Sequence, residues 1–164
     1  MRKLSTGVVL FAGLMAQAPM TDYAGLPAPV PEQKEEDPRL ARLREFFQTF
    51  GSPAHQLAED FLIAADNHSL DWRLLPSISI IESGGGKAYR NNNIFGWDNG
   101  DKRFHTVREG IHRVANRLAN SRLYRDKSVS EILRTYNGTD EYPAKVLAVM
   151  ERLEPSETTA SSLN

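Results

Sequence analysis

Glu82 and its surroundings are the part of the sequence best suited to acid–base chemistry. An apolar segment at residues 74–81 leads to this carboxylate, and the run Ser-Gly-Gly-Gly at 83–86 follows it. A carboxylate at the C-terminus of a helix faces the negative end of the helix dipole, and apolar neighbours withhold water from it. Both effects raise the pKa, so we expect Glu82 to keep a proton near neutral pH and to act as a general acid. A Glu that ends a helix and points into water is the simpler interpretation of the same residues.

A polar and aromatic segment follows at residues 91–97, with the sequence Asn-Asn-Asn-Ile-Phe-Gly-Trp. Asparagine amides bind sugar hydroxyls and the Trp97 ring can stack on a sugar face, but asparagine is also a common turn residue. Tyr136 falls on the apolar face of a short predicted helix, so we expect its ring in the core and its hydroxyl at a cleft. We expect three other aromatic rings in the core, those of Trp72, Phe95 and Tyr142.

Glycoside hydrolysis usually requires a second carboxylate, and the loop after the aromatic segment offers two candidates, Asp98 and Asp101. The two carboxyl groups lie about 5–5.5 Å apart in retaining enzymes and about 6.5–9.5 Å apart in inverting ones. Turn formation also explains Asp98 and Asp101, and capping of the last helix explains Asp140 and Glu141. If no second carboxylate serves, Glu82 would perform both steps.

The two ends of the chain differ in composition from the region between them. Residues 1–18 predict a signal peptide, with two basic residues, an apolar stretch and a final Ala-Gln-Ala. This stretch is shorter than the roughly 18 residues that span a bilayer, so we expect export to the periplasm or the medium and no stable membrane span. The Pro-rich, acidic residues 19–37 predict a disordered linker, and the polar residues 154–164 predict a disordered tail. Between them, residues 38–153 predict one domain, which we expect to be monomeric.

The charge of this domain narrows the class of partner. The whole chain has a formal net charge of -1, yet residues 39–153 hold 17 Lys and Arg against 14 Asp and Glu, or +3. This excess suits an anionic polymer such as peptidoglycan and is too small to indicate nucleic acid, and ordinary surface charge explains it better than either. The chain has no cysteine, and its four histidines lack the spacing of metal ligands. We therefore predict neither a metal nor another cofactor.

Helix start signals recur along the predicted domain and indicate an all-α fold. Asp37 and Ser52 each stand directly before a proline, a pairing typical of the first turn of a helix. Asp71 can cap the helix that carries Glu82. Pro76 removes a backbone donor in the second turn of that helix, so we expect a mild kink or a late start.

Further start signals lie in the second half of the chain. Thr106 and Ser128 begin two capping boxes, and Thr139 or the next residue is expected to begin the last helix. Residues 84–105 have no helical period and predict a loop or small hairpin, with a turn at 99–100. The architecture expected from these signals is all-α, with one irregular lobe directly after the proposed acid.

Four sequence elements occur in a definite order. They are Leu-Asp-Trp-Arg-Leu-Leu-Pro at 70–76, Glu-Ser at 82–83, Asn-Asn-Ile-Phe-Gly-Trp at 92–97, and Tyr-Asn-Gly at 136–138 with Tyr142 after it. Together they resemble the bacterial lysozyme-like glycosidases, and more closely the peptidoglycan endo-β-N-acetylglucosaminidase branch. The Tyr-Asn element is shared with lytic transglycosylases. The resemblance spans most of the predicted domain and implies a lysozyme-like helical fold.

This resemblance also implies roles for individual residues. Glu82 would be the general acid, and Ser83 would be its hydrogen-bonding neighbour. Tyr136 and Asn137 would lie opposite Glu82 and orient it or the N-acetyl group of the sugar. The glycan groove would be shaped by five residues of the loop, Asn92, Asn93, Phe95, Gly96 and Trp97. The family often has a bulky residue before the Gly that follows Glu-Ser, whereas this chain has three glycines at 84–86, which would loosen the surroundings of the acid.

We therefore predict an exported glycosidase that cleaves β-1,4 bonds in the glycan strands of peptidoglycan, with Glu82 as general acid. A lytic transglycosylase that uses Glu82 alone is one alternative, and the resemblance implies its mechanism. Glu82 would protonate the leaving oxygen and then act as base while a 6-hydroxyl or N-acetyl group of the sugar attacks. A domain of the same fold that binds the glycan without cleaving it is another, and a helical adaptor that binds no sugar is a third. The expected partner is the peptidoglycan strand, with no nucleic acid.

Overall fold

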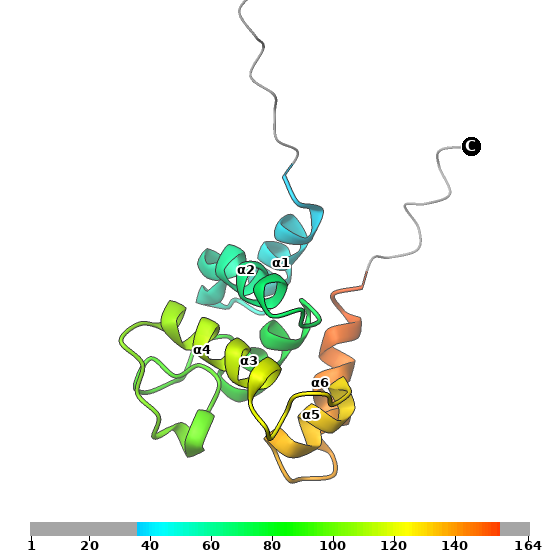
Figure 1. Cartoon of the computed structure of the whole chain (residues 1–164). Coiled ribbons are helices and arrows are strands. Elements are labelled where there is room, and N and C mark those ends of the chain that lie inside the picture. The colour runs from blue at the N-terminus through cyan, green and yellow to red at the C-terminus, as the bar shows by residue number, and fades with distance from the viewer. Residues whose placement is uncertain (1–35, 155–164) are drawn as a thin grey trace, which may run out of the picture. The chain divides into compact units, whose positions relative to one another are not determined.

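Six α-helices and two short 3₁₀ helices form most of the part of the chain that the computed structural model describes, residues 36–154 (Figure 1). No strand occurs among these residues, and an isolated bridge joins Arg90 to Asn93. The predicted all-α class is therefore confirmed. The predicted signal peptide at 1–18, nearly all of the linker at 19–37 and nearly all of the tail at 154–164 lie outside the described residues.

The first helices begin at the predicted caps. Helix α1 (Pro38–Thr49) starts after Asp37, whose carboxylate accepts a hydrogen bond from the backbone N–H of Arg39. The 3₁₀ helix η1 (Pro53–Leu57) starts after Ser52, whose hydroxyl accepts the N–H of Ala54, and α2 (Ala58–Asn67) continues from it. In both places a capping side chain supplies an acceptor for a free N–H of the first turn.

Helix α3 (Leu74–Ser83) carries Glu82 in its last turn. The predicted cap at Asp71 is wrong, because the helix begins three residues later with Arg73 at the N-cap position. Asp71 instead holds the turn before the helix, where its carboxylate accepts the N–H of Arg73 at 2.9 Å. The expected late start is confirmed, and it places Pro76 in the first turn, where the missing N–H costs no helical hydrogen bond.

Helices α4 (Val107–Asn120) and α5 (Val129–Tyr136) begin at the two predicted start signals, but of the two predicted capping boxes only that at Ser128 is complete. At Thr106 the reciprocal bond is wrong, because the Glu109 carboxylate accepts the N–H of His105 instead. The Thr106 hydroxyl accepts the N–H of Glu109, and Ser128 and Glu131 cap α5 reciprocally. These caps fix where each helix enters the fold. For α5 this matters directly, because its last residue, Tyr136, reaches the candidate site described below.

The last helix, α6 (Tyr142–Glu151), begins later than predicted. The predicted start at Thr139 or the next residue is wrong, because the Thr139 side chain bonds Asn137 and does not cap a helix. Its N–H and its hydroxyl both donate to the Asn137 side-chain oxygen, at 3.1 and 3.0 Å. The Thr139 carbonyl then accepts the N–H of Tyr142, so one turn precedes the helix.

A continuous core holds these helices together. Helix α2 packs against α1, α3 and α4, while α6 packs against α3 and α5. A row of aromatic rings runs through the first half of the core: Phe47 lies 5.1 Å from Phe61, and Phe61 lies 6.2 Å from Phe95. Phe95 belongs to the irregular segment after α3 and is fully buried. The loop lobe is thus anchored on the same core as the helices.

The irregular segment between α3 and α4 is built on hydrogen bonds and not on a hairpin at 99–100. The tight turn lies at Asn91 and Asn92, both with positive φ, and the bridge from Arg90 to Asn93 closes it. Residues 97–100 form the short turn η2 (Trp97–Gly100) instead, in which Asp98 and Asn99 have left-handed backbone angles and not those of a 3₁₀ helix. In Figure 1 the outer part of this segment lies on one side of the domain, and α5 and α6 lie on the other.

Candidate active site

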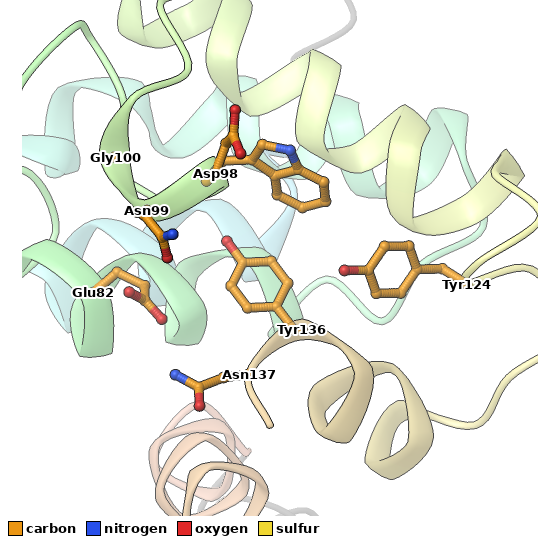
Figure 2. A pocket seen from close by; sticks show the side chains of 9 residues that line it. Glu82, Asp98, Asn99, Gly100, Tyr124, Tyr136 and Asn137 are labelled. Carbon is orange, nitrogen blue, oxygen red and sulfur yellow. The ribbon is translucent and has the colours of Figure 1, made fainter. Parts of the chain in front are cut away.

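A cleft of about 560 Å³ opens above Glu82, at the last turn of α3 (Figure 2). Four segments that are far apart in the sequence line it. They are Glu82, residues 96–100 in and before η2, Tyr124 after α4, and Tyr136 with Asn137 at the end of α5. The helices and the loop lobe therefore bring one carboxyl group, aromatic rings and amides to a single concave surface, the arrangement common at ligand sites.

The Glu82 carboxyl group is half-buried and bonded on one side. The Tyr142 hydroxyl donates a hydrogen bond of 2.6 Å to Glu82 Oε1. Burial raises the pKa of Glu82, and the hydrogen bond from Tyr142 opposes that shift because it stabilises the charged form. The net pKa of Glu82 stays above its usual range, as the sequence predicts. Burial, together with the contact to Glu82, raises the pKa of Tyr142, so its hydroxyl remains a donor.

Gly96 lies against the other oxygen of the carboxyl group. Its backbone has φ of 61°, and a Cβ built on it would lie 2.5 Å from Glu82 Oε2. That distance is a severe overlap, so only glycine lets the loop approach the acid so closely. Glu82 is therefore held between a hydroxyl on α6 and a backbone segment of the loop lobe.

Aromatic rings form one wall of the cleft. The Trp97 ring lies 5.3 Å from that of Tyr136, edge to face, and 6.0 Å from that of Tyr124. Tyr136 also stacks on Tyr142, with ring planes 8° apart. The Tyr136 hydroxyl donates a hydrogen bond of 2.6 Å to the carbonyl of Phe95, which ties α5 to the loop lobe. The hydroxyl that bonds Glu82 thus belongs to Tyr142, while Tyr136 braces the wall.

Asn137 presents its amide to the cleft from the end of α5. Its side-chain oxygen accepts two hydrogen bonds from Thr139, which leaves the amide nitrogen on the opposite side. In Figure 2 this nitrogen points toward the cleft and Glu82. Asn137 can therefore donate to an acceptor on a ligand, such as a carbonyl or hydroxyl oxygen.

Four of the predicted site residues do not line the cleft and support it from behind. The Ser83 hydroxyl donates to the Ile94 carbonyl at 2.7 Å and accepts the Gly86 N–H, so its bonds join α3 to the loop and not to Glu82. Asn92 donates to two carbonyls ahead of α4. Asn93 is buried and accepts the N–H of Trp97 while donating to its carbonyl. The fourth is the fully buried Phe95.

The two candidates for a second carboxylate lie in different surroundings. Asp98 lines the cleft and is exposed, with φ of 54°, and in Figure 2 its carboxylate points away from Glu82. Asp101 does not line the cleft and forms an ion pair of 2.7 Å with Arg90. Among the cleft-lining residues of the described chain, Asp98 is thus the one other acid beside Glu82.

The three glycines after Glu82 have defined packing. Residues 84–86 all have positive φ, and Gly84 ends α3 in the left-handed conformation. A Cβ on Gly85 would lie 2.2 Å from the Ser52 hydroxyl, which donates to the Gly85 carbonyl at 2.7 Å. The glycine run therefore lets η1 and the end of α3 pack closely, an effect opposite to the loosening that the sequence suggests.

Within residues 36–154 no group of His, Asp and Glu side chains is arranged to hold a metal ion. None of the helices described there has the length and hydrophobicity needed to cross a bilayer.

Sequence reasoning missed three contributors to the site. Tyr142 is expected only as a core ring, which it is, but its hydroxyl reaches an acid 60 residues earlier in the chain. Tyr124 and Asn99 also line the cleft. In the sequence, the one indication that Tyr142 belongs to the site is its place in the ordered set of motifs. Tyr124 lies outside any motif, and no local pattern indicates it.

Comparison of the chain with family models, with curated proteins and with solved structures finds no match.

Proposed function

We propose that the chain is an exported glycosidase that cleaves β-1,4 bonds in peptidoglycan glycan strands, with Glu82 as general acid. One observation carries the proposal. A half-buried carboxyl group with a raised pKa opens onto a cleft lined by aromatic rings and amides, the groups that bind sugars. The ordered motifs shared with lysozyme-like glycosidases support the choice of glycan. Export rests on the predicted signal peptide alone.

In the first step protonated Glu82 donates its proton to the oxygen of the glycosidic bond. The bond from that oxygen to the sugar C1 breaks, and the leaving sugar departs with a free hydroxyl. Tyr142 holds Oε1 and Gly96 crowds Oε2, so the direction of the carboxyl group is fixed before the sugar binds. Once ionised, Glu82 is stabilised by the hydrogen bond from Tyr142.

The second step has two candidate nucleophiles. Water would attack C1 in a hydrolase, whereas the 6-hydroxyl of the same sugar would attack in a lytic transglycosylase. In either route Glu82 takes the proton of the nucleophile and returns to its starting state. Two observations favour the route through Glu82 alone: Asp101 is paired with Arg90, and Asp98 points away from Glu82.

Isosteric amides test these assignments on purified peptidoglycan. We expect Glu82→Gln to lower fragment release by about 100-fold to 10,000-fold, the usual contribution of a general acid. Asp98→Asn and Asp101→Asn serve as matched controls, and we expect each to keep activity within about tenfold if Glu82 acts alone. A loss in Asp98→Asn as large as that in Glu82→Gln would instead indicate a two-carboxylate hydrolase. Activity retained in Glu82→Gln would refute the proposal.

A further inference from the structure

A second groove, of about 740 Å³, continues from the cleft past Trp97 and Asp98, which line both. It runs between the loop lobe and the outer face of α4. We call it the basic groove, because Lys102, Arg103, Arg113 and Arg117 line it together with His105. No Lys or Arg of the described chain lines the cleft itself. Two adjoining surfaces thus differ in charge, one suited to neutral sugars and the other to anions.

The positive charge of the basic groove is largely unpaired. Two acids line the groove, Asp98 and Glu109. The Glu109 carboxylate accepts the backbone N–H of His105 at 2.7 Å and forms an ion pair with Arg113 at 3.2 Å. Lys102, Arg103 and Arg117 have no carboxylate within 4 Å in residues 36–154. All three of these side chains are exposed. They remain free to bind carboxylates of a ligand.

The floor of the groove is apolar. Phe104 and Val114 are buried beneath it, and the partly buried Trp97 stands where the groove meets the cleft. A ligand that combines small apolar groups with several carboxylates matches this surface better than a bare phosphate chain does. Short peptides of small and acidic residues have this chemistry.

We propose that the basic groove binds the carboxylate-bearing stem peptide of the glycan strand whose sugars occupy the cleft. This inference rests on the proposed function, because a stem peptide branches from a sugar of the bound strand and therefore starts beside the cleft. Trp97 marks the junction between sugar and peptide. The groove makes the chain selective for peptide-bearing strands over strands from which the peptides have been removed.

Binding measurements in the Glu82→Gln background test this without cleavage of the ligand. The probes are peptidoglycan oligomers with their stem peptides, the same oligomers stripped by an amidase, and the isolated stem peptide. We expect the peptide-bearing oligomers to bind about fivefold more tightly than the stripped ones, since each exposed ion pair contributes little. The preference should shrink as salt is added.

Two charge-matched double variants locate the effect. Lys102→Gln with Arg117→Gln removes two charges from the groove. Lys87→Gln with Arg134→Gln removes two exposed charges that line neither the groove nor the cleft. We expect the first pair to abolish the preference and the binding of isolated peptide, and the second pair to keep both.

The outcomes separate this proposal from the proposed function. Equal affinity for both oligomers, or a preference that survives in the groove variant, would overturn the groove assignment even if wild type cleaves the glycan. Groove-dependent binding of the isolated peptide, with no fragments released by wild type, would support the groove and refute the glycosidase.

Discussion

The Glu82 carboxyl group is positioned by two residues on opposite sides of it, Tyr142 and Gly96. Neither contact is visible in local sequence patterns, because each joins segments that meet only in the folded chain. The sequence predicts the acid itself and its raised pKa from the apolar helix before it, since that effect is local. It does not predict which hydroxyl reaches the acid: Tyr136 is the candidate from the motif, and the structure gives that contact to Tyr142.

Replacing Gly96 by Ala tests the close approach of loop and acid. The new Cβ would overlap Glu82 Oε2. In addition, an alanine at position 96 would have to adopt a positive φ, which residues with a side chain rarely do. We expect a loss of about 1–2 kcal/mol in unfolding free energy. Activity should fall by about 100-fold, because displacing a catalytic group by about 1 Å has an effect of that size. Urea denaturation and fragment release would measure the two effects.

Gly138→Ala is the control for this variant, because a Cβ at Gly138 meets no atom of the described part of the chain within 4 Å and its φ is not positive. We expect it to behave like wild type. Equal activity in Gly96→Ala and wild type would contradict the geometry around Glu82.

The hydroxyl of Tyr142 lowers the pKa of Glu82, so Tyr142→Phe should raise it further. A general acid works in its protonated form, and activity is lost as pH rises through its pKa. The variant should therefore lose activity at a higher pH than wild type does, with a lower maximal rate because Oε1 is no longer held. NMR titration of the Glu82 carboxyl carbon measures the shift directly. Tyr124→Phe, which removes a cleft hydroxyl that does not bond Glu82, should leave the midpoint unchanged; a lower midpoint in Tyr142→Phe would contradict the assignment.

At the scale of elements, local chemistry decides how well the sequence predicts the fold. The caps at Asp37, Ser52, Thr106 and Ser128 are correct because a side chain bonds the backbone within its own first turn. The start of the last helix is wrong because Thr139 bonds the Asn137 side chain instead of capping. The loop after α3 is predicted as irregular, but its internal network of Asn side chains and carbonyls is not predictable from spacing.

The joint between α3 and this loop depends on Ser83. Removing its hydroxyl in Ser83→Ala leaves the buried Ile94 carbonyl without that donor, so we expect a loss of about 1–3 kcal/mol in unfolding free energy. Ser77→Ala is the matched control on the same helix, because the buried Ser77 hydroxyl has no hydrogen-bond partner among residues 36–154. It should be neutral or slightly stabilising. Urea denaturation measures the unfolding free energy of both variants. Equal losses of unfolding free energy would show that the bond from Ser83 does not hold the joint.

At the scale of the molecule, the sequence predicts a mildly basic domain but not where the charge lies. The fold separates the charges, with the acid and aromatic rings in the cleft and the free cations along α4 and the loop before it. Residues from distant segments meet here because of tertiary packing. The ordered motifs predict such proximity only for segments that themselves carry a motif. Arg117 and Lys102 carry none, and the basic groove became apparent only in the structure.

The masses of fragments released from purified peptidoglycan, by wild type and by Glu82→Gln, test the central claim most directly. We predict glycan fragments from wild type and almost none from the variant. Anhydro ends would identify a transglycosylase, and reducing ends a hydrolase. Fragments released equally by both proteins, or by neither across several types of cell wall, would contradict a glycosidase that acts through Glu82.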